Sequence, residues 1–435
     1  MSEADILKQK LENAIADSIK KYYENTNTKA FSRNRKLDLS TLIHLILSMD
    51  GSSNRKEILR HNLNCSDAAL CQRRQKISSD IFEDIFHKFN ELCEDTKRYK
   101  NYRCFAIDGT NIPIATNASS DTYLWTGSPK SSYSAYHLTP IYDIVNGAYM
   151  DAVIQPKSKF SEIAAAEFLL SWCDFPEKSI LILDRGFESY NMIGLLKNTS
   201  NCDFVMRVKQ SATAMRVIKT LPMEKLDIDV SVVITLHQRK SNPDNYVFIQ
   251  TGSLKGKENS KKTVISKWYF GDLYELTFRV VRDKIPNTDT YETIITSLDR
   301  QEFSAADIFD LYKRRWKIEV NAFRNLKYTI GLMNQHQRKD DLCKQQIWAS
   351  LILQNFCSRI ISSIDVPQKE ENKYEYAIDY KMAVSLCKEF FRTPNADGEK
   401  LLKDISKYVV PVRPDRQEDR NLKAKSFSGF CYRIP

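Results

Sequence analysis

The chain has 435 residues, of which 42% are hydrophobic and 28% charged, and this composition predicts a globular protein of two or three domains. No run of 18 apolar residues occurs and the first residues are polar and acidic, so we expect neither a membrane span nor a signal peptide. The ten cysteines form no Cys-x2-Cys pair and no close Cys/His grouping, which argues against a zinc ribbon or disulfide framework and for a reducing cytoplasm. The net charge of +10 permits a nucleic-acid partner without requiring one.

Residues 1–100 carry apolar residues at helical spacing and predict a small helical domain. Two basic clusters, at residues 33–36 and 73–76, lie between the expected helices. The second cluster follows Ser66 and Asp67, which are good helix-capping residues. We therefore predict a DNA-binding domain, although a solvated surface helix explains the second cluster about equally well. The residues expected to contact DNA are Arg33, Arg35, Arg73 and Arg74.

Between residues 101 and 211, strand-like runs alternate with helical ones, which predicts a three-layer α/β domain. Two of the strand-like runs end in an aspartate, Asp108 after residues 105–107 and Asp184 after residues 179–183. A single aspartate after an apolar run is more often a turn former or a helix cap. Because turn chemistry follows both of them, both could project from strand ends of one sheet.

Residues 212–300 alternate strand-like runs with polar loops and predict an all-β insertion. The runs cover residues 230–236, 246–250, 264–270, 276–281 and 293–296. Trp268 in this block could stack on a flipped base, but a buried tryptophan is the commoner outcome. Residues 341–435 predict a helical C-terminal region with a basic tail, because apolar helical runs occur at 347–361 and 383–391.

The helix expected over residues 307–327 carries two charges on its apolar side. At about 100° per residue, the apolar face comprises Ile308, Leu311, Tyr312, Trp316 and Phe323. Glu319 and Arg315 fall on the same face, where an unpaired charge is costly. Asp108, Asp184 and Glu319 therefore predict three carboxylates that converge on metal from separate elements. The simpler alternatives are that Arg315 neutralises Glu319 and that Tyr312 belongs to the core.

The segment Tyr312-Lys313-Arg314-Arg315-Trp316-Lys317-Ile318-Glu319 resembles the Tyr-x2-Arg-x3-Glu signature of cut-and-paste DDE transposases of bacterial insertion sequence family four. The phrases Asp108-Gly109-Thr110 and Asp184-Arg185-Gly186-Phe187 are similar to those of the family, and the resemblance covers nearly the whole chain. It implies an α/β fold with a ribonuclease-H-like catalytic core, a mixed sheet flanked by helices, in residues 101–211 and 301–340. The all-β insertion would interrupt this core, and helical regions would precede and follow it.

The resemblance implies a DNA transposase that cleaves transposon ends and joins them to target DNA, with a hairpin intermediate. Asp108, Asp184 and Glu319 would be catalytic and would hold two Mg²⁺ ions, which Mn²⁺ could replace. Tyr312, Arg315 and Lys327 would contact phosphates near the scissile bond. The implied partners are double-stranded DNA, as terminal inverted repeats and as target, and a second copy in a homodimer. The protein would work at the nucleoid in the cytoplasm, with no organic cofactor and no membrane.

One position departs from the family signature. The family places a lysine after six residues that follow the glutamate, which is Leu326 here, and the lysine comes one position later at Lys327. Counting back from Lys327 would place the acid at Val320, which cannot bind a metal ion, so we retain Glu319. We predict a one-residue π-bulge between Glu319 and Lys327, a feature that often marks functional sites.

Three other functions remain open. A nuclease of the same fold would cleave DNA without joining it, and a transposase-derived protein without catalysis would only bind DNA. A two-carboxylate glycosidase is disfavoured, because it explains neither the third acid nor the basic ends of the chain. Serine or cysteine hydrolase chemistry has little support, because only six histidines and no Gly-x-Ser-x-Gly motif occur.

Overall fold

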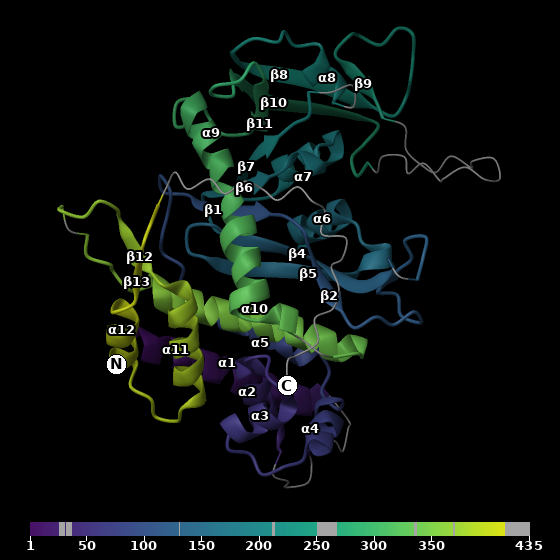
Figure 1. Ribbon diagram of the computed structural model, residues 1–435. Coiled ribbons are helices and arrows are strands. Elements are labelled where there is room, and N and C mark those ends of the chain that lie inside the picture. Colours follow the sequence, from purple (N-terminus) through teal and green to yellow (C-terminus); the bar gives the residue numbers. More distant parts are fainter. Residues whose placement is uncertain are drawn as a thin grey trace.

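A computed structural model describes residues 1–25, 31, 37–129, 131–210, 214–249, 268–334, 337–368 and 370–413. Within these segments, no helix has both the length and the apolar character needed to cross a bilayer. The chain folds around one large mixed sheet, with helices on both of its faces (Figure 1).

The centre of the sheet contains the strands that lead to the two predicted aspartates. The first seven strands are β1 (Arg103–Ile107), β2 (Thr110–Ile114), β3 (Tyr123–Leu124), β4 (Tyr133–Asp143), β5 (Ala148–Pro156), β6 (Ser179–Leu183) and β7 (Cys202–Arg207). β4 pairs antiparallel with β1, β2, β3 and β5, whereas β1, β6 and β7 are parallel neighbours. The parallel order β1-β6-β7 brings the carboxyl ends of β1 and β6 to one edge of the sheet.

The strands of residues 212–300 extend this sheet. They are β8 (Leu226–Thr235), β9 (Tyr246–Phe248), β10 (Leu273–Lys284) and β11 (Tyr291–Thr296). β11 pairs with β7, and the order continues through β10 and β8 to β9. The block is not all β, because the short helix α8 (Arg216–Lys219) precedes β8. The run expected at 264–270 lies mostly outside the described residues, and its described part, 268–270, is not a strand.

Alternate residues of the central strands face two different helical layers, as a strand period of two requires. Phe105 and Ile107 of β1 belong to the core that contains α6 (Glu162–Trp172) and α7 (Tyr190–Asn198). Cys104 and Ala106 belong to the opposite core, which contains residues of α1 (Glu3–Asn25), α5 (Asp80–Leu92) and α10 (Asp340–Ser362). The predicted three-layer arrangement is therefore present.

Five further α-helices of the described chain lie towards its two ends and pack on each other or on α1 and α10. They are α2 (Leu39–Ser48), α3 (Asn54–Arg60), α4 (Asp67–Arg74), α11 (Tyr380–Arg392) and α12 (Gly398–Ser406), with the small sheet of β12 (Tyr376–Ile378) and β13 (Val409–Pro411). α1 contacts α5 as well as α10 and α12, so the first and last helical regions share one core. In Figure 1 the long helix α10 runs beside α5, between the sheet and the N-terminal helices.

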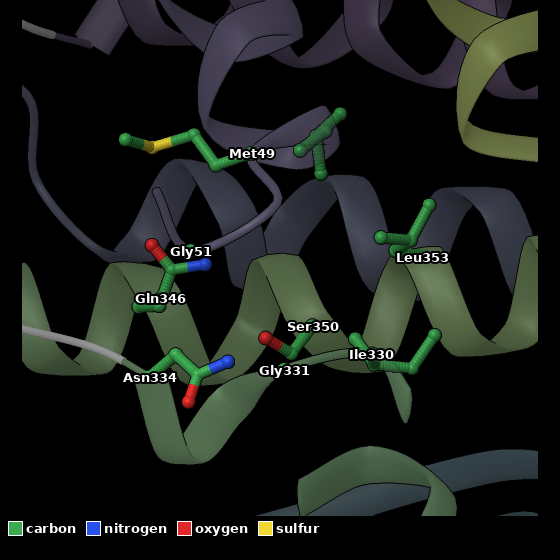
Figure 2. A pocket seen from close by; sticks show the side chains of 9 residues that line it. Met49, Gly51, Ile330, Gly331, Asn334, Gln346, Ser350 and Leu353 are labelled. Atoms are coloured by element: carbon green, nitrogen blue, oxygen red, sulfur yellow. The ribbon is translucent and has the colours of Figure 1, made fainter. Parts of the chain in front are cut away.

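A small cavity lies where α2, α10 and residues 330–334 meet (Figure 2). Its volume is about 10 Å³, which is close to the minimum for one water molecule, so it cannot hold a substrate. Gly51 beside it has a φ of +80°, and a Cβ at this residue would lie 2.8 Å from the Cβ of Asn334. The cavity is a gap in the packing between the N-terminal helices and α10. None of the predicted site residues lines it.

Candidate active site

Asp108 and Asp184 leave the sheet side by side. Ile107 lies opposite Leu183 in the parallel pair β1 and β6, so the next residue of each strand is one of the two aspartates. Each carboxylate anchors its own turn: Asp108 Oδ1 accepts a hydrogen bond from Gly109 N (2.8 Å), and Asp184 Oδ1 accepts one from Gly186 N (2.6 Å). The prediction that both aspartates project from strand ends of one sheet is confirmed.

Glu319 lies on a helix that changes its geometry. α9 (Ala305–Arg314) begins with a capping box of Ser304 and Asp307, and π-helical segments follow at Ile318–Phe323 (η3) and Asn325–Thr329 (η4). The predicted π geometry is present but is more extensive than one bulge. Since π turns close between residues i and i+5, the buried side departs from the α-helical pattern. Trp316, which we expected in the core, is 42% exposed. It lies between α9 and η3, where Arg315 N donates to Tyr312 O and Ile318 N to Arg315 O, so the α-helical register already breaks before the π segments begin.

Arg315 joins two of the predicted acids. Its Nη1 donates to Asp108 Oδ2 (2.9 Å) and its Nη2 to Glu319 Oε1 (3.1 Å). The Arg315 side chain is only 6% exposed, whereas that of Glu319 is 38% exposed. Arg315 thus neutralises Glu319, as the simpler alternative held, and it also brings Glu319 to the turn that contains Asp108.

Lys327 reaches the same turn. Its Nζ donates to Thr110 Oγ1 at 2.6 Å, two residues after Asp108. Burial lowers the pKa of Lys327. An i to i+5 turn contains one residue more than an α turn, so the π segments absorb the extra residue between Glu319 and Lys327. The shifted lysine therefore lies beside the candidate site.

The three acids lie close enough for the charges of Asp184 and Glu319 to change the pKa of Asp108. Burial raises the pKa of Asp108 to about 6 and outweighs the opposing effects of the Gly109 N–H and Arg315. The negative charges of Asp184 and Glu319 raise this pKa further. Burial alone would lower the pKa of Arg315, but Tyr312 and the three carboxylates raise it above its ordinary value.

Tyr312 is part of the main core and is 4% exposed. Burial raises the pKa of its hydroxyl, and Arg315 and Arg207 oppose this rise. Tyr312 thus belongs to the core, as the simpler alternative held, and its phosphate contact stays a prediction. Trp268 is half-buried, packs on Phe270 and Tyr274, and donates from Nε1 to Gly271 O at 3.1 Å.

The basic cluster of α4 turns inward. Arg73 is 8% exposed and donates to Leu37 O at 3.1 and 2.8 Å, and Arg74 is 5% exposed. Arg74 donates to Gln345 Oε1 (3.2 Å) and Gln346 Oε1 (3.1 Å), and so ties α4 to α10. Both guanidinium groups are used inside the protein, so the expected DNA contacts of Arg73 and Arg74 are corrected. Arg33 and Arg35 lie outside the described residues.

A histidine and a glutamate beside Asp108 were missed by sequence reasoning. His137 of β4 is 3% exposed, and its Nδ1 lies 2.8 Å from Asn111 Oδ1. Its Nε2 lies 2.9 Å from Glu162 Oε1, and this contact lowers the pKa of Glu162. A Cβ at Gly109 would overlap both His137 Nε2 and Glu162 Oε1. The sequence contains one hint of this pair, because a histidine is unusual inside an apolar strand. A lone histidine does not reveal that its partner is Glu162.

The three acids fit a divalent ion in chemistry but not in their arrangement. Carboxylate oxygens are the ligands that Mg²⁺ prefers. Within the described residues, however, no group of three or more His, Cys, Asp and Glu side chains is arranged to hold a metal ion. Two of the three carboxylates instead share the guanidinium of Arg315.

Residues 99–356 match the family model described as "Transposase DDE domain", which covers more than half of the 435 residues. The chain belongs to this family. It is 31% identical over 110 residues to the putative transposase InsL of insertion sequence element IS186A from Escherichia coli, which is 25% of this chain and 30% of that protein. The transposase of IS421 from Escherichia coli is also 31% identical over 110 residues, covering 29% of its length. The chain therefore matches less than a third of the length of these relatives.

A solved structure of piggyBac transposase, in a synaptic complex with hairpin DNA, aligns with 97% of this chain and 86% of its own. The TM-score is 0.44 and the sequence identity 10%.

Proposed function

We propose that this protein is a DNA transposase that cleaves the ends of a mobile element and joins them to target DNA. The observation that carries this proposal is the meeting of Asp108, Glu319 and Lys327 at the turn after β1, with Asp184 on the adjacent strand end. Membership of the transposase DDE domain family supports it. We assign the chain more narrowly to the cut-and-paste type of insertion sequence family four, on the Tyr312 to Glu319 signature.

We interpret strands β5-β4-β1-β6-β7 as a ribonuclease-H-like core. Three antiparallel strands followed by two parallel ones, with α6 and α7 as the connections, support this interpretation. The core would comprise residues 101–211 and 301–340. Residues 212–300 would be the insertion, residues 1–100 the DNA-binding region, and residues 341–435 the C-terminal region.

Asp108, Asp184 and Glu319 would hold two Mg²⁺ ions, or Mn²⁺, which when bound activate the attacking water and stabilise the leaving oxygen. Cleavage breaks a phosphodiester bond and leaves a 3′-hydroxyl at the element's end. We propose that this hydroxyl attacks a phosphodiester of the opposite strand to form a hairpin and releases the flanking DNA with a 3′-hydroxyl. Water would then open the hairpin and regenerate the 3′-hydroxyl of the element, which attacks a phosphodiester of target DNA and releases a target 3′-hydroxyl. Arg315 and Lys327 would orient the phosphates, Arg315 through two parallel hydrogen bonds. Cutting both ends together would require a homodimer.

A test is to incubate the purified protein with labelled duplex DNA that carries the inverted repeats flanking its gene. The proposal predicts nicking in Mg²⁺, no nicking when the metal is chelated, and joining of the labelled end to a second duplex. Nicking without joining would identify a nuclease of the same fold.

Binding without nicking would favour a transposase-derived DNA-binding protein. The pairing of Arg315 with two of the three acids makes this the second candidate, because carboxylates that stay engaged cannot hold metal.

A further inference from the structure

The guanidinium of Arg315 holds the oxygens that the proposed function assigns to metal. It bonds Asp108 Oδ2 at 2.9 Å and Glu319 Oε1 at 3.1 Å, while Asp108 Oδ1 accepts from Gly109 N. Both oxygens of Asp108 are therefore engaged. An arginine side chain does not lose its proton in a protein, so Arg315 remains a cation that competes for these oxygens.

We propose that Arg315 couples metal loading to DNA binding: it occupies Asp108 and Glu319 in the free protein, and a DNA phosphate draws it away and releases them. This inference rests on the proposed function, because it takes Asp108 and Glu319 as metal ligands. The proposed coupling explains why acids whose chemistry suits a metal ion are not arranged to hold one in the described part of the chain.

A phosphate is a suitable competitor for this guanidinium. The planar fork of an arginine matches phosphate and carboxylate oxygens equally well, whereas a lysine offers only a point charge. The Nε of Arg315 is buried and has no hydrogen-bond partner among the described residues, so its present pairing leaves one donor unused. A phosphate that accepts from Nε and one Nη would satisfy that donor.

Arg315 lies between a buried and an exposed aromatic side chain. Its guanidinium carbon lies 5.2 Å from the centre of the Trp316 ring and 5.8 Å from that of Tyr312. Tyr312 is buried, whereas Trp316 is 42% exposed. In the proposed release, the guanidinium would move towards solvent along Trp316, where it keeps a favourable contact with an aromatic face.

Coupling of this kind is reciprocal, so DNA must strengthen metal binding by the same factor by which metal strengthens DNA binding. The test measures Mn²⁺ affinity of the full chain by calorimetry, with and without a short duplex oligonucleotide. In the parent protein we expect the duplex to tighten Mn²⁺ binding roughly 5- to 150-fold, the usual range for coupled sites. Arg315→Gln should bind Mn²⁺ tighter without DNA, and the duplex should add little.

Arg314→Gln is the matched control, because Arg314 is the adjacent arginine but pairs with Asp310 at 2.9 Å instead of with the site. It should keep the parental Mn²⁺ affinity and the parental response to DNA. Arg315→Lys retains a positive charge but cannot bond both carboxylates in the same way, so it should give an intermediate result even if Arg315→Gln fails to fold. Equal Mn²⁺ affinities for the parent and the folded Arg315 variants would overturn the inference.

Asp108→Asn separates that failure from a failure of the proposed function. If Asp108→Asn abolishes Mn²⁺ binding while the Arg315 variants leave it unchanged, the metal site stands and the coupling is wrong. If Asp108→Asn also leaves Mn²⁺ binding unchanged, both the metal site and the coupling are wrong.

Discussion

Gly109 is required beside Asp108 because two side chains occupy the space that a Cβ would need. His137 and Glu162 lie against the backbone of this residue, from β4 and from the first turn of α6. Glu162 is half-exposed at its end and can shift, whereas the His137 ring is 3% exposed and fixed by Asn111. The glycine therefore leaves room for the contact between His137 and Glu162 against the turn that contains Asp108.

We predict that Gly109→Ala lowers the free energy of unfolding by about 1–3 kcal/mol, the usual cost of forcing an extra carbon into a packed site. The rate of DNA nicking should fall by more than the loss of folded protein explains, because the turn that contains Asp108 is displaced. Denaturant unfolding and a nicking assay measure the two effects. Gly271→Ala is the control, since a Cβ there meets nothing within 4 Å. Equal behaviour of the two variants would refute the packing argument.

His61 contributes a pH dependence to the N-terminal helices. Burial lowers its pKa to about 4, and the charges of Arg392 and Arg60 add to this effect. His61 takes up a proton near pH 6.5 in the unfolded chain but only near pH 4 in the folded chain. The free energy of unfolding is therefore highest above pH 6.5 and decreases as the pH falls towards 4.

We predict that His61→Gln flattens the fall in the free energy of unfolding between pH 6.5 and pH 4. Denaturant unfolding at several pH values measures the effect. His237→Gln is the control, because the His237 side chain is 57% exposed. A parental pH profile in His61→Gln would show that another group titrates.

At the scale of elements, α9 and the π segments show which parts of a helix the sequence can predict. Capping by Ser304 and the burial of Ile308 and Leu311 follow from local pattern. The π geometry was foreseen only because Lys327 falls one residue beyond its family position. The extent of the π geometry, and the exposure of Trp316 just before it, depend on packing against the sheet and so are not encoded in the helical period alone.

Deleting Asn321, an exposed residue of η3, should be tolerated because it removes the extra residue of a π turn. Lys327 would then take the family spacing from Glu319, and nicking should be retained. Deleting Lys313, an exposed residue of α9, should abolish nicking, because it rotates Arg315 and Glu319 by about 100°. Thermal melting and a nicking assay of the two deletion variants test this prediction. Loss of nicking in both deletions would show that the π segment itself is needed.

Arg74 ties α4 to α10, and a sequence pattern cannot predict this tie because its partners lie 271 and 272 positions away. We predict that Arg74→Met lowers the free energy of unfolding by about 1–3 kcal/mol, since buried acceptors lose their donor. The affinity of the folded protein for DNA should not change. A marked loss of DNA affinity at unchanged stability would restore Arg74 as a DNA contact.

At the scale of the whole molecule, residues distant in sequence converge on one sheet. Asp95, Asp143, Arg103 and Arg359 form a partly buried network that joins α10 to β1 and β4. The period of apolar residues predicted the three layers and the ends of β1 and β6. It did not predict that β8 to β11 would extend the same sheet, because strand pairing across long loops depends on contacts with no local signature.

In the candidate site too, local sequence patterns predict some features, whereas contacts between distant residues are seen only in the folded chain. The two aspartates could be placed from sequence because each directly follows a buried strand. The contacts of Arg315 with Asp108 and of Lys327 with Thr110 span 207 and 217 positions, and only the folded chain reveals them. His137 and Glu162 went unnoticed for the same reason.

The most direct test of the account is the rate of Mg²⁺-dependent nicking of end DNA by single variants of the three acids. Asp108→Asn, Asp184→Asn and Glu319→Gln should each reduce nicking to the level seen without metal, while the protein still folds and binds DNA. Asp289→Asn, at a fully exposed aspartate, should keep the parental rate. Near-parental nicking by any one of the three acid variants would contradict the assignment of that residue and the three-carboxylate site.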